Sequence, residues 1–481
     1  MNIIHVSAEC YPAAKAGGLA DVVGSLPKYM NELEAEASVI MPHYMTEWIK
    51  SARTKLLFEG RAPLGNSDFA FRIHRVEEPD LGFKFYLVDI PGRFDRPGVY
   101  IDPWSGFPYW DEKERFFSFQ IAVLEWLKES GQEPDVVHSH DHHGSLIPFM
   151  MSHSYRYEVF ADTPSVLTIH NGEYQGRYHS NDYMLLPAFN LDKLGLLEWN
   201  EGMNSLAAGI KTAWQVTTVS EGYMQELLEF CHGLETLLQQ EKLKTRGILN
   251  GIDQDVWNPL KDTFIEKNYS LRNYKSGKKK NKLELLKEFN LNNDRPVFAF
   301  IGRLVREKGA DLLPDLIGRI VESEIEASFV VLGTGDPSLH NYFHNLQNKY
   351  VGYFDTRLEY NESLAHQIYA GSDFLLMPSR VEPCGLNQMY AMKYGSIPIV
   401  RATGGLKDTV IDISQEEGYG FTFENFNLEE AAEAIERAVK LYSDQSHFDT
   451  VRKRIMKLDF SWEKSAGTYI KLYHKLLNLK E

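Results

Sequence analysis

Two cationic side chains stand where an α/β protein would bind a phosphorylated ligand. Arg303 and Lys308 lie in FIGRLVREKG (300–309), at the end of the apolar run 296–302 that predicts a buried strand. Ligands of open α/β sheets bind outside the carboxyl ends of strands, so both cations are expected at such an end. A single surface cation is usually solvated, but two cations that flank one turn predict a clamp for a pyrophosphate.

A Gly-Gly-Leu element occurs twice, once near each end of the chain. KAGGLADVV begins at Lys15, and TGGLKDTV begins at Thr403. In both copies a glycine pair follows an apolar run and precedes a helical pattern, which lets backbone amides approach a phosphate at a helix start. The alternative is a simple turn between strand and helix. Neither copy is a P-loop, and GTGDPS (333–338) lacks the third glycine of a dinucleotide-binding fingerprint.

A carboxylate and a cysteine lie in the loop that opens PSRVEPCGLNQMYAMKYG (378–395), after another apolar run. Glu382 could accept hydrogen bonds from sugar hydroxyls, and the amides of Gly385 and Leu386 could bind phosphate oxygens at a helix start. Cys384 has no base placed beside it in the sequence. We therefore expect Cys384 to line the pocket rather than to act as a nucleophile.

Four histidines and an aspartate occur within VVHSHDHHGS (136–145), a composition that suggests a metal site. Their order is not that of a helical H-E-x-x-H site, and we expect no metal there. We interpret Asp141 as a carboxylate that binds hydroxyls or stabilises positive charge developing on carbon. His170, in TIHNGEYQG (168–176), is expected at the end of a neighbouring strand and facing the same crevice. The alternative is a metal-dependent hydrolase with the ligands His138, His140, Asp141 and His142.

Composition restricts the partners and the compartment. The 481 residues include 51 basic and 67 acidic side chains, for a net charge of −16, which repels nucleic acids and anionic membranes. No apolar run reaches the roughly 18–20 residues of a membrane span, and the start does not resemble a secretory signal. Three scattered cysteines are too few for a disulfide framework and indicate the cytoplasm.

The alternation of short apolar runs with helical stretches predicts an α/β protein with parallel sheets, and the length predicts two domains. Strands are expected at 2–7, 37–42, 135–140, 164–170 and 214–220, and in the second half at 296–302, 328–333, 373–378 and 397–400. Residues 69–76 and 82–89 are expected to form a hairpin, 111–129 an amphipathic helix, and 461–477 a final helix. The basic run 277–282 is expected to be a solvated loop or helix start.

These motifs, in this order from residue 6 to about 410, resemble the bacterial glycogen synthase and plant starch synthase family. The resemblance rests on KAGGLADVVGSLPK, VVHSHDHH, TIHNGEYQG, TTVS, ILNGID with WNP, IGRLVREKG, PSRVEPCGLNQMYAMKYG and RATGGLKDTV. It implies the GT-B architecture, an α/β fold with two Rossmann-like domains and an active-site cleft between them. The domains would span 1–245, completed by 460–481, and 246–459.

The resemblance also implies roles for individual residues. The catalytic set would be Lys15, Asp141, His170, Arg303, Lys308 and Glu382. The donor-binding set would be Gly17, Gly18, Asp21, Asn250, Tyr360, Cys384, Gly385, Leu386, Thr403, Gly404 and Gly405, with Asp253 in the inter-domain segment and Tyr360 stacking on the base. No metal or other cofactor is implied.

The implied activity is transfer of glucose from ADP-glucose or UDP-glucose to an α-1,4-glucan, with retention of configuration. His142 stands where the family usually has tryptophan, and Asn171-Gly172-Glu173 where it usually has Asn-Leu-Ala, so the departures cluster on the acceptor side. Two further alternatives stay open: a non-catalytic sensor of glucan or nucleotide, and a related GT-B enzyme with another sugar or acceptor.

Overall fold

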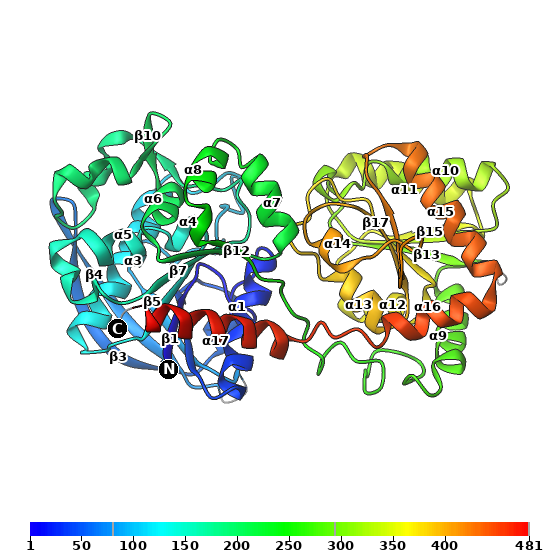
Figure 1. Ribbon diagram of the computed structural model, residues 1–481, viewed down its shortest axis with the longest axis horizontal. Coiled ribbons are helices and arrows are strands. Elements are labelled where there is room, and N and C mark those ends of the chain that lie inside the picture. The colour runs from blue at the N-terminus through cyan, green and yellow to red at the C-terminus, as the bar shows by residue number, and fades with distance from the viewer. Residues whose placement is uncertain (79–80, 293–294, 480–481) are drawn as a thin grey trace. The chain divides into compact units, whose positions relative to one another are not determined.

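The computed structural model describes residues 1–78, 81–292 and 295–479. The chain divides into two compact units, Met1–Asn250 with Trp462–Glu481, and Gly251–Ser461 (Figure 1). This division lies a few residues after the expected boundary at 245 and 246. The reason is that strand β12 (Thr245–Gly247) still pairs with β11 (Gln215–Thr218) in the sheet of the first unit.

A nine-stranded sheet forms the centre of the first unit, in the order β12-β11-β7-β6-β1-β2-β5-β4-β3. The strands from β12 to β5 run parallel, and β4 and β3 add antiparallel pairs. The remaining bounds are β1 (Asn2–Val6), β2 (Glu36–Pro42), β3 (Thr54–Leu64), β4 (Ser67–Val76), β5 (Lys84–Asp89), β6 (Val136–His140) and β7 (Ser165–Ile169). The predicted hairpin is confirmed by β4 and β5, whereas β3 was not predicted, because its outer residues are largely exposed.

Helices cover this sheet, and a three-stranded sheet in the order β8-β10-β9 lies apart from it. Their bounds are α1 (Gly18–Glu32), α2 (Glu47–Ser51), α3 (Glu112–Glu129), α4 (Asp141–Gly144), α5 (Ile147–His153), α6 (Ser205–Thr212), α7 (Glu221–Glu229), α8 (Glu235–Gln240), β8 (Arg177–Tyr178), β9 (Glu198–Trp199) and β10 (Gly202–Asn204). Helix α3 was expected to be amphipathic. Instead, every residue from Arg115 to Leu127 is buried, because the helix lies inside the unit with protein on all sides.

The final helix α17 (Trp462–Asn478, red in Figure 1) belongs to the first unit. Its residues Tyr469, Leu472 and Tyr473 share a buried apolar cluster with Leu26 and Met30 of α1. The hydroxyl of Tyr473 also lies 2.7 Å from Nδ1 of His138 in β6. The predicted segment 460–481 includes residues 480 and 481, which lie outside the described residues.

The second unit has a six-stranded parallel sheet in the order β15-β14-β13-β16-β17-β18. Its strands are β13 (Val297–Ile301), β14 (Ser328–Leu332), β15 (Phe354–Arg357), β16 (Phe374–Met377), β17 (Ile397–Arg401) and β18 (Phe421–Phe423). Its helices are α9 (Tyr274–Glu288), α10 (Leu313–Glu322), α11 (Pro337–Lys349), α12 (Glu362–Gly371), α13 (Asn387–Lys393), α14 (Gly404–Thr409), α15 (Leu428–Ser443) and α16 (Gln445–Ile455). The two units together confirm the predicted α/β class with two Rossmann-like domains.

The basic run 277–282 lies within α9, and the expectation that its lysines are solvated is wrong for two of them. Lys278 is 2% exposed, and its Nζ donates to the carbonyls of Tyr369 and Tyr394. Lys282, whose side chain is 15% exposed, forms an ion pair with the buried Asp373. Local sequence does not reveal these partners, because all of them come from distant segments.

None of the described helices is long and apolar enough to cross a membrane. The three cysteines, Cys10, Cys231 and Cys384, are buried and form no disulfide.

Candidate active site

Each sheet has a point at which the order of its strands reverses, and the predicted site residues follow the strands beside that point. In the first unit β1 lies between β2 and β6, and in the second unit β13 lies between β14 and β16. In each unit the chain first adds strands on one side of β1 or β13 and later adds strands on the other side of the same strand. Such switch points open a crevice at the carboxyl ends of the strands, which is where α/β proteins bind ligands.

An ion pair between Lys308 and Glu382 joins the loops after β13 and β16. Nζ of Lys308 lies 2.8 Å from Oε1 of Glu382, and Ser379 donates to Oε2 at 2.9 Å. Glu382 is 7% exposed, whereas the Lys308 side chain keeps 21% of its surface accessible. Both carboxylate oxygens are thus held in place, and part of the Lys308 side chain remains accessible. This pair supplies one fixed positive and one fixed negative charge at the predicted ligand position.

Arg303 lies in the same loop as Lys308 but is more exposed. Its guanidinium pairs with Glu307 at 3.2 Å, and 63% of its side chain is accessible. The loop itself is held firmly, because Arg380 forms a two-point ion pair with Asp311 and its amide donates to the carbonyl of Glu307. The structure therefore brings Arg303, Lys308 and Glu382 to one strand edge of the second unit.

Gly309 is required at its position for two reasons. Its φ is +69°, and a Cβ there would lie 1.9 Å from the carbonyl oxygen of Pro378.

We expect Gly309→Ala to lower the melting temperature by about 5–10 °C, because the left-handed backbone and the clash both cost free energy. Calorimetry checks this, with Gly467→Ala in α17 as the control. A Cβ at Gly467 meets no atom closer than 3.9 Å, so that variant should be unchanged or slightly stabilised. Equal melting temperatures for the two variants would contradict the argument.

The remaining candidates of the second unit lie in the loop of Glu382, at the start of α14, after β15, or, for Asp253, in the segment that begins the unit. The amide of Gly405, at the start of α14, donates to the carbonyl of Glu382. Cys384 is 5% exposed and Thr403 is 2% exposed, whereas Tyr360 is 77% exposed and donates to Glu362. The other positions are Gly385 with φ +69°, Leu386 at the N-cap of α13, Gly404 as the first residue of α14, and Asp253, which accepts from the amide of Asp255.

In the first unit, Lys15 pairs with Asp21 at 2.7 Å. The glycine loop is held by Glu9, which was not among the predicted site residues. Glu9 accepts hydrogen bonds from the amides of Ala16 at 2.5 Å and Gly17 at 2.9 Å. The Gly17 amide, expected to face a phosphate, is thus occupied in this state. Gly18 begins α1, so both Gly-Gly-Leu elements do open a helix as predicted.

The sequence shows that Glu9 lies between the first predicted strand and the glycine pair, but it does not show that Glu9 is buried. In the structure this carboxylate residue is 3% exposed. Its other oxygen accepts from the Tyr100 hydroxyl at 2.7 Å. A charged residue at such a place needs partners, and here they are the amides of the adjacent loop.

Asp141 and His170 follow the neighbouring strands β6 and β7. Oδ1 of Asp141 accepts a 2.7 Å hydrogen bond from the amide of His170, and Asp141 has a φ of +51°. Burial raises the pKa of Asp141 to about 7, although hydrogen bonds from the amides of His170 and Asn171 oppose the shift. Asn250, the last residue of this unit, is buried, and its Oδ1 has no hydrogen-bond partner among the described residues.

The raised pKa of Asp141 predicts a pH-dependent stability. Between about pH 4 and 7 the folded state binds more protons than the unfolded state, so the carboxylate lowers the free energy of unfolding as pH rises. We expect Asp141→Asn to melt several degrees higher than the native protein at pH 8, and the gap to shrink toward pH 5. Thermal denaturation across this range measures the gap. A gap that is constant with pH would show that burial does not raise the pKa of Asp141.

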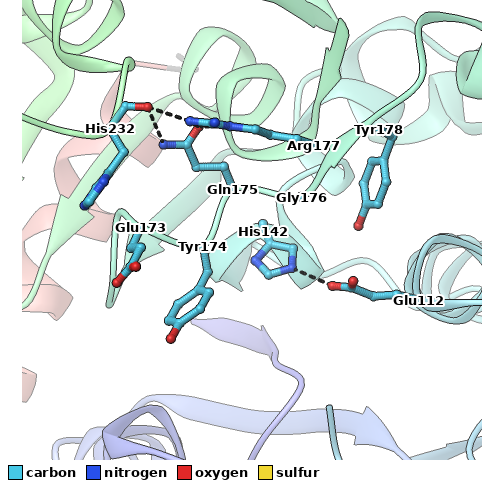
Figure 2. A pocket seen from close by; sticks show the side chains of 9 residues that line it. All are labelled: Glu112, His142, Glu173, Tyr174, Gln175, Gly176, Arg177, Tyr178 and His232. Carbon is cyan, nitrogen blue, oxygen red and sulfur yellow. Dashed lines mark hydrogen bonds and ion pairs between the residues drawn. The ribbon is translucent and has the colours of Figure 1, made fainter. Parts of the chain in front are cut away.

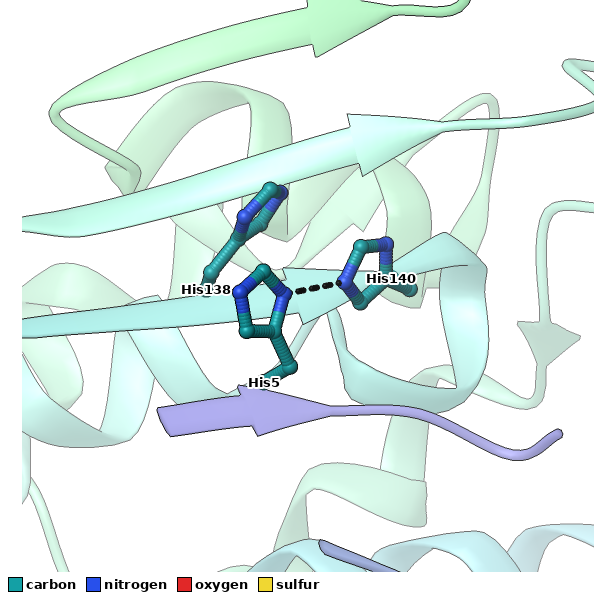
Figure 3. A group of neighbouring side chains, drawn as sticks. All are labelled: His5, His138 and His140. Atoms are coloured by element: carbon teal, nitrogen blue, oxygen red, sulfur yellow. Dashed lines mark hydrogen bonds between the residues drawn. The ribbon is translucent and has the colours of Figure 1, made fainter. Parts of the chain in front are cut away.

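The histidine-rich segment does not bring together the four ligands that the alternative of a metal-dependent hydrolase requires. His138 and His140 project into the protein beside His5 (Figure 3), whereas Asp141 binds the His170 amide and His142 faces Glu112 at 3.4 Å. The described residues instead contain two other groups with ligand atoms within 4.8 Å of one another: His5 with His138 and His140, and Glu112 with His142 and His143. Both nitrogens of His138 and both of His140 are occupied by hydrogen bonds.

A cavity of about 390 Å³ opens beside His142 in the first unit (Figure 2). Its polar groups are held in place, since Gln175 and Arg177 both donate to the carbonyl of His232. Aromatic rings of Tyr174 and Tyr178 supply apolar surface. The cavity is lined by Glu112, His142, Glu173, Tyr174, Gln175, Gly176, Arg177, Tyr178 and His232. Aromatic surface with fixed donors and carboxylates is suited to a polyhydroxylated ligand.

The chain is similar to known proteins over its whole length. The family described as "Starch synthase catalytic domain" matches residues 2–240, and "Glycosyl transferases group 1" matches residues 281–453. The glycogen synthase of Flavobacterium johnsoniae is 47% identical over 481 residues and covers all of both chains. That of Geobacillus stearothermophilus is 36% identical over 495 residues, covering 100% of this chain and 99% of the relative.

Two solved structures are similar to this chain, one of a starch synthase and one in fold alone. The catalytic domain of starch synthase IV from Arabidopsis thaliana, bound to ADP and acarbose, superposes with a TM-score of 0.87 at 32% identity, covering 99% of both chains. Sucrose-phosphate synthase from Thermosynechococcus elongatus has a TM-score of 0.60 at 17% identity, with full coverage of both chains, which is a likeness of fold alone.

Proposed function

The chain belongs to the glycogen and starch synthase family of glucosyltransferases, and on this premise we propose that it uses ADP-glucose as donor and retains the configuration at C1 of glucose. The acceptor would be the non-reducing end of an α-1,4-glucan. UDP-glucose is the second candidate donor, since a tyrosine at position 360 could stack on either base. No metal would be required, and the cysteine content favours the cytoplasm.

The observation that carries this proposal is the Lys308–Glu382 pair at the switch point of the second unit. Transfer of glucose breaks the bond from C1 to the diphosphate, so negative charge grows on the leaving oxygen and positive charge on the sugar ring. Lys308 and Arg303 would stabilise the leaving diphosphate, and Glu382 would bind hydroxyls of the sugar. Charges fixed before the reaction contribute most, because no reorganisation is needed in the transition state.

The first unit would contribute Lys15, Asp141 and His170 to the same donor. Lys15 pairs with Asp21 in this state, and a diphosphate would compete with that carboxylate for the ammonium group. The amide of Gly18 and the helix it begins would add partial positive charge.

Retention could proceed by attack from the face that the diphosphate leaves. The hydroxyl of the acceptor would form the new bond to C1 while the bond to the diphosphate breaks, and a phosphate oxygen would take the hydroxyl proton. This route needs no carboxylate nucleophile. The acceptor chain would run past the cavity of Figure 2, where Tyr174, Arg177 and Glu112 offer an apolar surface, a donor and an acceptor.

A transfer assay tests the proposal. The protein is incubated with ADP-glucose or UDP-glucose and a maltooligosaccharide primer, in EDTA, and the product is analysed for length and anomeric configuration. We expect α-1,4-linked extension, faster with ADP-glucose and unaffected by EDTA. Failure to extend the primer from either donor, or a β-linked product, would contradict the proposal, and loss of activity in EDTA would contradict its metal-independent form.

A further inference from the structure

Three buried histidines from neighbouring strands form a hydrogen-bonded row that ends at the candidate site. Nδ1 of His5 in β1 lies 3.1 Å from Nε2 of His140 in β6, and Nδ1 of His140 lies 3.0 Å from Nε2 of His170 after β7. Figure 3 shows the first of these contacts, with His138 beside it. The row runs from the centre of the first sheet to its carboxyl edge, and its last member is the residue proposed to contact the sugar.

All three imidazoles are neutral near pH 7. Burial lowers the pKa of His5 and of His170 to about 3, and burial with the neighbouring imidazoles holds the pKa of His140 well below its usual range. A neutral imidazole carries one N–H, on either Nδ1 or Nε2. Each ring is therefore a donor at one nitrogen and an acceptor at the other.

Only two proton arrangements satisfy both contacts. If His140 carries its proton on Nδ1, it donates to Nε2 of His170 and must accept from Nδ1 of His5. If it carries the proton on Nε2, both hydrogen bonds reverse, and the protons of His5 and His170 also lie on Nε2. The three rings thus change tautomer together.

The surroundings of His5 separate the two arrangements. Its Nε2 is buried and has no hydrogen-bond partner among the described residues. In the second arrangement this atom would be an N–H donor without an acceptor, whereas in the first it is only an unused lone pair. Orphaned buried donors are rarer in proteins than under-satisfied acceptors, so the first arrangement is favoured.

We propose that His5 acts as a positioning residue which, through His140, fixes His170 in the Nδ1–H tautomer and so presents a neutral hydrogen-bond donor to an oxygen of the bound sugar. The choice of a sugar rests on the proposed function. Across the described residues, nothing in the structure hydrogen-bonds to Nδ1 of His170. This residue is 9% exposed, and its backbone amide donates to Asp141. A neutral donor binds a hydroxyl without repelling the positive charge that develops on the sugar ring.

His138 is a neighbour of the row but not a member of it. Its ring stacks on His140 with centroids 4.3 Å apart, yet its nitrogens contact Tyr473 and Thr168 instead. The proton arrangement of His138 is therefore set independently. Because His138 forms no hydrogen bond within the row, His5 is the residue whose substitution can change the tautomer of His170.

The tautomer is measured directly by nitrogen NMR of the whole chain labelled with ¹⁵N-histidine, without substrate. His170→Asn assigns the resonances of residue 170. We expect His170 to be protonated at Nδ1 and not at Nε2, and to remain neutral from pH 5 to 8. Protonation at Nε2, or titration within this range, would overturn the proposal. This result is independent of whether the protein transfers glucose, so it separates failure of this inference from failure of the proposed function.

Two variants of His5 test the consequence for activity. His5→Asn places an amide nitrogen at the position of Nδ1 and can still donate to His140, whereas His5→Phe preserves the ring and most of the volume but cannot donate. We expect kcat/KM within about threefold of the native value for the asparagine variant and at least a tenfold loss for phenylalanine. If packing alone matters, the phenylalanine variant should be more active than the asparagine variant. That outcome, or equal activities, overturns the proposal. Thermal denaturation confirms that both variants fold, and if one does not, the NMR result decides.

Discussion

Lys308→Ala should lower kcat by about 10³-fold, because it removes a fixed positive charge from the position where the diphosphate leaves. The effect should appear in kcat and kcat/KM together, as expected for a charge that is used mainly in the transition state. Steady-state assays of glucan extension, with ADP-glucose varied, measure both constants. Circular dichroism shows whether the variant retains its fold.

A matched control separates this role from ion pairing in general. Lys349 also pairs with a carboxylate, Glu322, at 2.7 Å, but 61% of its side chain is accessible and it lies on the surface of the same unit. Lys349→Ala should keep nearly full activity, since exposed ion pairs contribute little. Near-normal turnover by Lys308→Ala would remove Lys308 from the mechanism.

Glu382→Gln should lower kcat by about 10²–10³-fold while leaving the protein folded. The amide keeps the shape of the side chain and can still contact Ser379, but the charge that would bind sugar hydroxyls and hold Lys308 is lost. Lys308 remains partly accessible and can be solvated. The transfer assay gives the rate, and a melting curve checks the fold.

Glu307→Gln is the closest control for this change. Glu307 also contacts Lys308, at 3.6 Å, and pairs with Arg303, yet it does not lie in the loop after β16. We expect less than about a fivefold loss of kcat. Equal losses for the two glutamine variants would mean that general negative charge, rather than the placed carboxylate of Glu382, is required.

The parts of the fold that sequence predicted are those set by local pattern. Apolar runs of buried parallel strands are distinctive, and a glycine pair at a helix start marks the end of such a strand. Because parallel strands share one direction, residues after β1, β6, β7, β13 and β16 had to reach the carboxyl edges of their sheets. The positions of Arg303 and Glu382 in the fold followed from that reasoning.

The parts that sequence could not predict depend on partners far along the chain. Lys278 is indistinguishable from a solvated lysine until Tyr369 and Tyr394 are placed beside it. Glu9 gains its role only when the loop folds back so that the Gly17 amide reaches its carboxylate. The link from His5 to His140 spans 135 residues and requires the register of β1 against β6.

We propose that Lys15, Arg303 and Lys308 bind the diphosphate of the donor, and a crystal structure of the protein with ADP tests this proposal most directly. We expect Lys15 to leave Asp21, and its ammonium group, Arg303 and Lys308 all to lie within hydrogen-bond distance of the phosphate oxygens. A bound ADP with Lys15 still paired to Asp21 and Arg303 directed elsewhere would contradict it.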